Sequence, residues 1–315
     1  MKRTLCLGLI ALLTLMLAAC GTQNAEKKTA ATESETEKIQ YLGKEYKVPA
    51  KVERLVIAGS MESMEDALML DVKPVGAMTV GGEFPALFKD ITGSTKPIGE
   101  KIQPNMEGIL KLKPDVILAS TKFPEEVVGK LEKIAPTIPV SHVSSRWEDN
   151  LHLLAGLTGK QADVEKILQQ YEDELQAAKT KLGDRLKDQK VMTIRIRNGN
   201  IMIYPESVFF NASLYEDLGL QPPAEVKKAK TQEMISLEKF SEMNPDVIFL
   251  QFSEDENKEQ PDVLAKLEKN PIWKSIDAVE KDQVFVNVVD PLAQGGTAWS
   301  KSQFLESIVE KLSEE

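Results

Sequence analysis

Residues 161–186, QADVEKILQQYEDELQAAKTKLGDRL, decide the fold of this chain. The stretch contains no proline and a single glycine, Gly183. Its apolar residues recur at spacings of three and four, the period of one face of an α-helix. They are Val164, Ile167, Leu168, Tyr171, Leu175 and Ala178. At about 3.6 residues per turn, the pattern predicts one amphipathic connecting helix of roughly seven turns over residues 161–187.

Short apolar strands alternate with helical stretches on both sides of this helix. The expected strands before it are 54–58, 75–78, 115–119 and 138–141, and the expected helices are 61–70 and 124–134. A second region of the same kind runs from Lys190 to the C-terminus. Such alternation is typical of parallel sheets in α/β layers. We therefore predict an α/β fold with two Rossmann-like lobes, residues 39–160 and 188–315, joined by the single long helix.

An internal repeat favours two lobes of similar construction. Residues 107–117, EGILKLKPDVI, match residues 238–248, EKFSEMNPDVI, on the other side of the helix. In both copies a glutamate opens a short helix, a proline ends it, and Asp-Val-Ile begins a strand. The tetrapeptide KLEK then recurs at 130–133 and 266–269. A chance match is the alternative interpretation.

The N-terminus has the features of a secretion signal. Two basic residues precede an apolar run over residues 5–17 that is too short for a permanent membrane span. Leu-Ala-Ala-Cys at residues 17–20 resembles the lipobox of bacterial lipoproteins. We predict a signal peptide at 1–19, a lipid on Cys20, and a flexible polar tether over 20–38. An ordinary signal peptide with a chance cysteine is the alternative.

Composition and charge exclude several classes of protein. The chain has 315 residues, 42% of them hydrophobic and 28% charged, with a net charge of −10. It therefore lacks the broad basic surface that general nucleic-acid binding requires. The two cysteines fall in the signal peptide and at the lipidation position, so no disulfide framework is expected. The two histidines, His142 and His152, lack partners at metal-ligand spacing, and we expect them to be core or surface residues.

Residues 191–204 predict a β-hairpin with two arginines on one face. Asn198-Gly199 is a strong type I′ turn signal between two strand-like segments. Residues two apart in a strand share a face, so Arg195 and Arg197 point the same way. Two adjacent guanidinium groups repel each other and need an anion or carboxylates nearby. The residues alone leave two interpretations open: an anion-binding site, or a solvated face with ordinary ion pairs.

Taken together, the lipobox, the tether, the two lobes and the connecting helix resemble one family. This is the helical-backbone class of periplasmic-binding-protein-like solute-binding proteins of ABC importers. Five segments resemble in particular its ferric-catecholate-binding lipoproteins, which serve Gram-positive iron uptake with siderophores of the bacillibactin and enterobactin type. The segments are SMED at 63–66, KFP at 122–124, RIR at 195–197, NPIWK at 270–274 and DPLAQGGTAW at 290–299.

The resemblance implies a ligand cleft between the lobes and assigns residues to it. The matching positions are Lys101 and Lys122 in the first lobe and Arg195, Arg197, Asn198 and Gln232 in the second. Asn198 stands where the family has the longer Gln. Without the family, both lysines would be interpreted as surface residues. Because iron(III) with three dianionic catecholates is a trianion whose oxygens fill the metal's coordination sites, the family's ligand needs cations and no protein metal ligand or cofactor.

Glu107 and Glu238 occupy equivalent places in the repeat. A carboxylate at a helix start is favoured by the helix dipole, which is one interpretation of both residues. In the family, one surface glutamate per lobe docks onto arginines of the two permease subunits. The resemblance therefore implies that Glu107 and Glu238 are the permease-docking pair.

The resemblance as a whole implies a non-enzymatic, monomeric protein, anchored by lipid on the extracytoplasmic face of a cell membrane. It would deliver a ferric siderophore to an ABC permease that works with a cytoplasmic ATPase. One alternative keeps the fold and changes the ligand to a ferric hydroxamate, haem or cobalamin. A lipid-anchored hydrolase and a purely structural surface lipoprotein are alternatives of other classes, although the sequence lacks GxSxG, HExxH and Walker A motifs.

Overall fold

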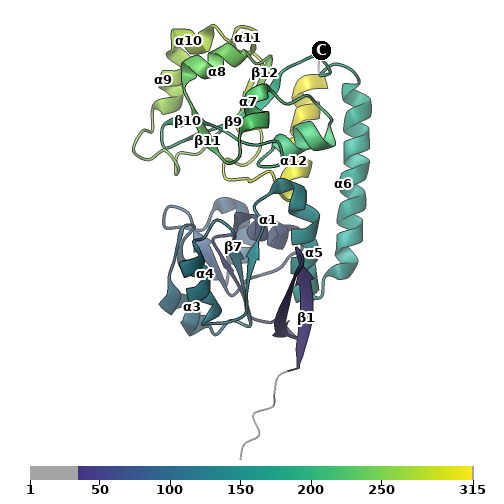
Figure 1. The fold of residues 1–315 in the computed structure, drawn as a ribbon, viewed down its shortest axis with the longest axis vertical. Coiled ribbons are helices and arrows are strands. Elements are labelled where there is room, and N and C mark those ends of the chain that lie inside the picture. The colour runs from purple at the N-terminus through teal and green to yellow at the C-terminus, as the bar shows by residue number, and fades with distance from the viewer. Residues whose placement is uncertain (1–34, 314–315) are drawn as a thin grey trace, which may run out of the picture. The chain divides into compact units, whose positions relative to one another are not determined.

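The computed structural model describes residues 35–313, which form two α/β lobes and the helix that connects them (Figure 1). The predicted signal peptide, Cys20 and most of the predicted tether lie outside the described residues. Within the described range, no helix is both long and apolar enough to cross a membrane. The predicted fold class is confirmed.

The N-lobe is built on a six-stranded sheet in the order β6-β5-β4-β3-β7-β8. All neighbouring strands are parallel except β6, which is antiparallel to β5. The strands are β3 (Leu55–Ala58), β4 (Gly76–Thr79), β5 (Lys96–Glu100), β6 (Gln103–Pro104), β7 (Val116–Ser120) and β8 (Thr137–Val140). The helices are α1 (Met61–Met69), η1 (Ala86–Phe88), α2 (Lys89–Thr92), α3 (Met106–Leu112), α4 (Glu125–Glu132), η2 (Ser144–Arg146) and α5 (Trp147–Thr158). Every residue of β3 and β7 is buried, as expected for central strands covered on both faces.

The C-lobe is built on a five-stranded sheet in the order β11-β10-β9-β12-β13. Strand β12 is parallel to β9 and β13, whereas β10 is antiparallel to β9 and β11. The strands are β9 (Val191–Arg197), β10 (Asn200–Ile203), β11 (Glu233–Ile235), β12 (Val247–Phe252) and β13 (Val284–Val286). The helices are η3 (Ala212–Asp217), α7 (Ala224–Lys228), α8 (Leu237–Met243), α9 (Val263–Lys269), α10 (Pro271–Lys274) and α11 (Asp277–Glu280).

The connecting helix α6 (Gln161–Leu182) is shorter than predicted, because it ends at Leu182 rather than continuing to residue 187. Gly183 follows with a φ of 54°, a conformation that breaks helical geometry and that glycine adopts without a side-chain clash. Helix α6 packs on α5 and on the C-terminal helix α12 (Ala298–Ser313). Through Leu305, α12 contributes to the N-lobe core, and through Phe304 it contributes to the C-lobe core.

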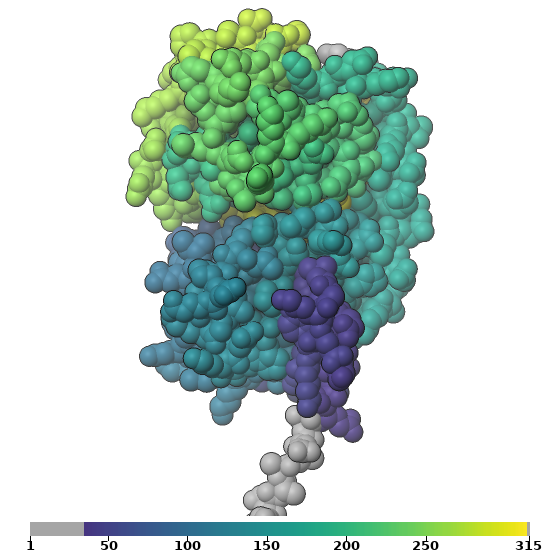
Figure 2. All heavy atoms as spheres, viewed as in Figure 1, coloured from purple at the N-terminus to yellow at the C-terminus, as the bar shows by residue number. Residues whose placement is uncertain are grey.

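The predicted tether overlaps a strand, and this part of the prediction was wrong. Strand β1 (Thr36–Tyr41) pairs with β2 (Lys44–Pro49) in an antiparallel hairpin on the surface of the N-lobe (Figure 2). The strand was missed because most of its residues are exposed and polar or charged, so the sequence shows no run of apolar residues there. The buried Tyr41 hydroxyl fixes the hairpin to the lobe, since it donates to Asn150 Oδ1 at 2.5 Å and accepts from the backbone N–H of Ser141 at 2.8 Å.

The sequence repeat corresponds to a helix–strand unit with the same local chemistry in both lobes. Helices α3 and α8 begin after the N-caps Asn105 and Ser236, and both end at a residue in left-handed conformation. Each helix is followed by an aspartate that accepts a hydrogen bond from the backbone N–H of the residue just before a neighbouring strand, β3 or β9. Asp115 accepts from the N–H of Arg54, and Asp246 accepts from that of Lys190, both at 2.8 Å.

The two lobes are also joined directly by hydrogen bonds between their residues. Glu65 on α1 is fully buried and accepts from the Gln294 N–H at 2.8 Å and the Thr297 hydroxyl at 2.6 Å. Both donors lie between β13 and α12. Ser144 of the N-lobe donates its hydroxyl to the Phe209 carbonyl of the C-lobe at 2.9 Å. These contacts hold the two lobes on either side of one cavity.

Candidate functional site

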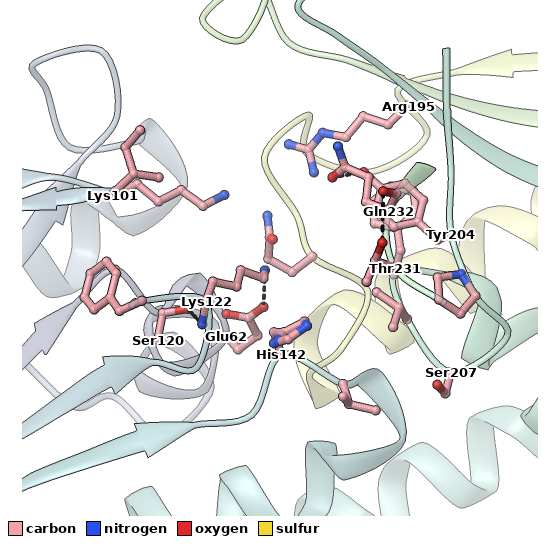
Figure 3. Close-up of a pocket in the computed structure, with 18 of the residues that line it drawn as sticks. Glu62, Lys101, Ser120, Lys122, His142, Arg195, Tyr204, Ser207, Thr231 and Gln232 are labelled. Atoms are coloured by element: carbon pink, nitrogen blue, oxygen red, sulfur yellow. Dashed lines mark hydrogen bonds and ion pairs between the residues drawn. The ribbon is translucent and has the colours of Figure 1, made fainter. Parts of the chain in front are cut away.

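A cavity of about 540 Å³, here called the cleft, lies between the lobes and is lined by residues of both. The N-lobe contributes residues that follow the carboxyl ends of its parallel strands β3, β5, β7 and β8. The C-lobe contributes β9 and the segments 204–209 and 230–232. Open α/β sheets bind ligands beyond the carboxyl ends of their strands. Figure 3 shows Lys101 and Lys122 reaching into this space from one lobe, with Arg195 and Gln232 on the opposite side.

Four cationic side chains line the cleft. They are Lys101 and Lys122 of the N-lobe and Arg195 and Arg197 of the C-lobe. Lys101 lies between β5 and β6, and Lys122 follows β7. The arginines occupy one face of β9, as the hairpin pattern predicts, and the turn after them has positive φ at Asn198 (48°) and Gly199 (75°).

Two carboxylates with little exposed surface pair with three of these cations. Glu62, in the first turn of α1, accepts from Lys122 Nζ at 3.1 Å, and its side chain is 4% exposed. Glu256 lies in the loop after β12, and its side chain is 9% exposed. It accepts from Arg195 Nε at 2.7 Å and lies 3.6 Å from Arg197 Nε. The arginine pair on its own left open whether carboxylates or an anion would neutralise it, and the structure shows that Glu256 does so in part.

Aromatic and amide groups complete the C-lobe side of the cleft. Gln232 Oε1 accepts from Arg197 Nη1 at 3.3 Å and from the Tyr204 hydroxyl at 3.2 Å. The Tyr204 ring stacks on Phe209 with centroids 4.5 Å apart, and the Arg195 guanidinium lies 5.8 Å from the Phe209 centroid. Planar cations beside aromatic rings can bind an aromatic anion by both charge and stacking.

Lys101 differs from the other three cations. Within residues 35–313, no side chain forms an ion pair or hydrogen bond with its ammonium group. Burial, together with the positive charges of Arg195 and Lys122, lowers the pKa of Lys101 to about 7. At neutral pH the amine is therefore protonated in only part of the molecules, and an anion in the cleft would favour its charged form.

Two further titratable groups at this site, His142 and Glu62, keep one charge state at pH 7 and above. Burial, reinforced by Lys122, lowers the pKa of His142, whose Nδ1 lies 2.8 Å from the Thr121 hydroxyl. Burial opposes the charge on Glu62, but Lys122, the backbone N–H of Glu62 and Lys101 together outweigh it, and the pKa of Glu62 lies below its usual value. The imidazole is therefore neutral and Glu62 is ionised at pH 7 and above.

Of the residues assigned to the cleft from the sequence, five line it: Lys101, Lys122, Arg195, Arg197 and Gln232. Asn198 does not, because it lies at the tip of the hairpin turn and lines an adjoining cavity of about 380 Å³. That cavity shares Lys101 and Arg197 with the cleft and also contains Glu256. The roles assigned to these residues remain predictions.

The predicted docking residues lie away from the cleft. Glu107 and Glu238 are exposed in the first turns of α3 and α8, the equivalent helices of the two lobes. Cys20 lies outside the described residues. Both glutamates are thus on the surface, and their docking role stays a prediction.

Sequence reasoning missed four residues of this site: Glu62, His142, Tyr204 and Glu256. The arginine pair signalled that a carboxylate or an anion was needed, but nothing in the sequence identified Glu256. Glu62 directly precedes the family-like segment 63–66, which was the available signal for it. Among the described residues, no group of three or more His, Cys, Asp or Glu side chains could hold a metal ion.

Comparisons with known proteins agree with this architecture. The family described as "Periplasmic binding protein" matches residues 56–287. The "Iron-uptake system-binding protein" of Bacillus subtilis is 57% identical over 316 residues, covering 100% of both chains. The crystal structure of the B. subtilis triscatecholate siderophore binding protein FeuA with ferri-bacillibactin matches with a TM-score of 0.87 and 59% identity, covering 89% of this chain and 99% of that one.

A more distant solved structure has the same fold. Staphylococcus aureus SirA, complexed with staphyloferrin B, matches with a TM-score of 0.75 and 28% identity, over 88% of this chain and 98% of that one. The resemblance inferred from the sequence is confirmed by these matches. With its two lobes, its connecting helix and a family match over most of its length, the chain belongs to the periplasmic binding protein family.

Proposed function

We propose that this chain is the solute-binding protein of an ABC importer for iron, and that it captures ferric catecholate siderophores of the bacillibactin and enterobactin type. The observation that carries the proposal is the cleft, in which four cationic side chains from two lobes face one space beside aromatic rings. The relative FeuA, whose structure holds ferri-bacillibactin, supports the same ligand class. No catalytic step is part of the proposal.

The charges of the cleft fit a trianionic ligand. Each cation about 4 Å from a negative charge contributes an attraction on the order of 4 kcal/mol near a protein surface, before desolvation. With Lys101 protonated, the four cations exceed the two carboxylates by two positive charges. A ferric tris-catecholate therefore meets a net positive cleft, whereas a neutral ferric hydroxamate gains no comparable attraction. Because catecholate oxygens surround the iron, the protein binds the complex without contacting the metal.

Delivery and anchoring are further parts of the proposal. The exposed Glu107 and Glu238 meet basic residues of the two permease subunits, one from each lobe. A lipid on Cys20 holds the protein, as a monomer, on the extracytoplasmic face of the membrane. The expected outcome of Cys20→Ala is a protein recovered in the soluble fraction, and normal membrane retention of this variant would contradict the anchor.

The ligand class is tested by fluorescence titration of residues 35–315 with four compounds: a ferric tris-catecholate, a ferric trihydroxamate, haem and cobalamin. We expect saturable binding of the tris-catecholate with an affinity at least about a hundredfold above that for the other three, equivalent to roughly 2.7 kcal/mol. Equal or tighter binding of an uncharged complex would refute the proposal. Mass spectrometry of protein purified from iron-limited culture gives an independent identification.

A further inference from the structure

Two largely buried carboxylates that pair with the cations of a cleft proposed to bind an anion require an explanation. Glu62 and Glu256 come one from each lobe, and their side chains are 4% and 9% exposed. Each pairs with cations that face the cleft rather than with cations elsewhere on the surface. A negative charge this close to the ligand space repels an anionic ligand, so the two residues do more than complete the basic lining.

The two carboxylates contact the cations from different sides, Glu256 from outside the cleft and Glu62 from within it. Glu256 spans two guanidinium groups, with Oε2 on Arg195 and Oε1 toward Arg197. It lines the cavity beyond Arg197 rather than the cleft itself. Glu62 lines the cleft and binds the Lys122 ammonium. Any anion that binds these three cations from the cleft must share them with a carboxylate already in contact.

On the basis of the proposed function, we propose that Glu62 and Glu256 determine the affinity and charge selectivity of the cleft. They act as resident counter-anions that compete with the ligand for Lys122, Arg195 and Arg197. In the empty cleft they relieve the repulsion between neighbouring cations and keep the ligand-free protein stable. In the complex the trianion neutralises the cations instead, and the two carboxylates then repel the trianion.

The direction in which ligand affinity changes when a carboxylate is neutralised distinguishes the proposal from a simple positioning role. If the carboxylates only held the cations in place, neutralising one of them would weaken ligand binding. If they compete, neutralising one destabilises the empty protein more than the complex, and ligand binding becomes tighter. Glutamine is the suitable replacement, because its Oε1 can still accept the hydrogen bond from Arg195 Nε or Lys122 Nζ while the charge is removed.

The dependence on ligand charge gives a second criterion. The Coulomb interaction scales with the charge of the ligand. A ferric tris-catecholate carries three negative charges, a ferric bis-catecholate one, and a ferric trihydroxamate none. The increase in affinity on neutralising a carboxylate should therefore be largest for the tris-catecholate, smaller for the bis-catecholate, and absent for the trihydroxamate. A purely structural change in the cleft has no reason to follow this order.

The experiment compares Glu256→Gln and Glu62→Gln with wild type by calorimetric titration with these three complexes at low and high salt. Glu254→Gln is the matched control, because Glu254 lies two residues from Glu256, is exposed, and is not a cleft residue. For each cleft variant we expect binding of the tris-catecholate at least about fivefold tighter than wild type at low salt, with a smaller difference at high salt. The control should bind as wild type does. Thermal unfolding without ligand should show lower melting temperatures for the two cleft variants.

The outcomes separate this inference from the proposed function. If wild type binds the tris-catecholate and both cleft variants bind it equally or more weakly, the competition is refuted and the proposed function stands. If Glu256→Gln does not fold, Glu62→Gln in the other lobe decides the same question. If wild type binds no ferric catecholate, the proposed function is refuted, and the inference falls with it.

Discussion

Binding of a ferric tris-catecholate should take up a proton at Lys101, so that affinity falls as pH rises above 7. Burial, with the charges of Arg195 and Lys122, lowers the pKa of this amine to about 7 in the empty cleft. A trianion in the cleft reverses the unfavourable potential and raises the pKa again. Between the two pKa values the complex holds one more proton than the free protein, and affinity therefore decreases with pH in that window.

The size of the effect follows from the pKa. With a free-protein pKa of about 7, close to half of the amines are protonated at pH 7 and about one in a hundred at pH 9. If the amine is fully protonated in the complex, the affinity falls about fiftyfold between these pH values, equivalent to roughly 2.3 kcal/mol. His142 is neutral and Glu62 is ionised over this range, because both pKa values lie below their usual values.

Calorimetric titrations from pH 7 to pH 9 measure this dependence directly. Buffers with different ionisation enthalpies report the number of protons taken up. Lys101→Met is the comparison variant, because it keeps the length and apolar stem of the side chain but cannot titrate. Burial raises the pKa of Glu65 to about 7, so its titration also falls in this range. The difference between the wild-type and Lys101→Met profiles removes that contribution and any titration of the ligand.

We expect Lys101→Met to bind more weakly than wild type at pH 7, and the ratio of the two affinities to shrink about fiftyfold between pH 7 and pH 9. A wild-type profile parallel to that of Lys101→Met would refute the reasoning. Proton release, or no proton exchange, in the buffer series would refute it as well.

Three further predictions concern other residues. Arg197→Ala should weaken ferric-catecholate binding by at least about 1.5 kcal/mol in a titration, because a charge-assisted contact is lost, and Arg197→Lys should recover only part; unchanged affinity would contradict the basic cleft. Glu107→Ala with Glu238→Ala should leave ligand affinity nearly unchanged but reduce iron uptake in cells, more than either single variant does; normal uptake would show that they are not the docking pair. Asp217→Asn should lower the free energy of unfolding by about 3 kcal/mol in denaturant titrations, because the buried ammonium of Lys301 loses its charged partner. The Lys301 side chain is 1% exposed and its Nζ lies 2.5 Å from Asp217 Oδ2. A loss under about 1 kcal/mol would contradict this prediction.

Local sequence patterns were sufficient to predict the architecture. The apolar period of three and four predicted the connecting helix, although the helix ends at Leu182, immediately before Gly183, and not at residue 187. The Asn198-Gly199 pair predicted the hairpin turn and therefore the common face of Arg195 and Arg197. The repeated Pro-Asp-Val-Ile segments predicted a shared helix–strand unit. Helix periodicity, turn conformation and strand alternation depend on residues close in sequence, and the chain therefore encodes them directly.

The charge balance of the cleft was decided by tertiary structure alone. Glu62 pairs with Lys122 across 60 positions, and Glu256 pairs with Arg195 across 61. No periodicity links residues so far apart; they meet because each lies near an end of elements that the parallel sheets bring side by side. The pKa of Lys101, which burial lowers to about 7, also depends on the opposite lobe, because the positive charge of Arg195 lowers it further. The sequence determined which cations were available, and only the packing of strands and loops within each lobe determined which carboxylates oppose them.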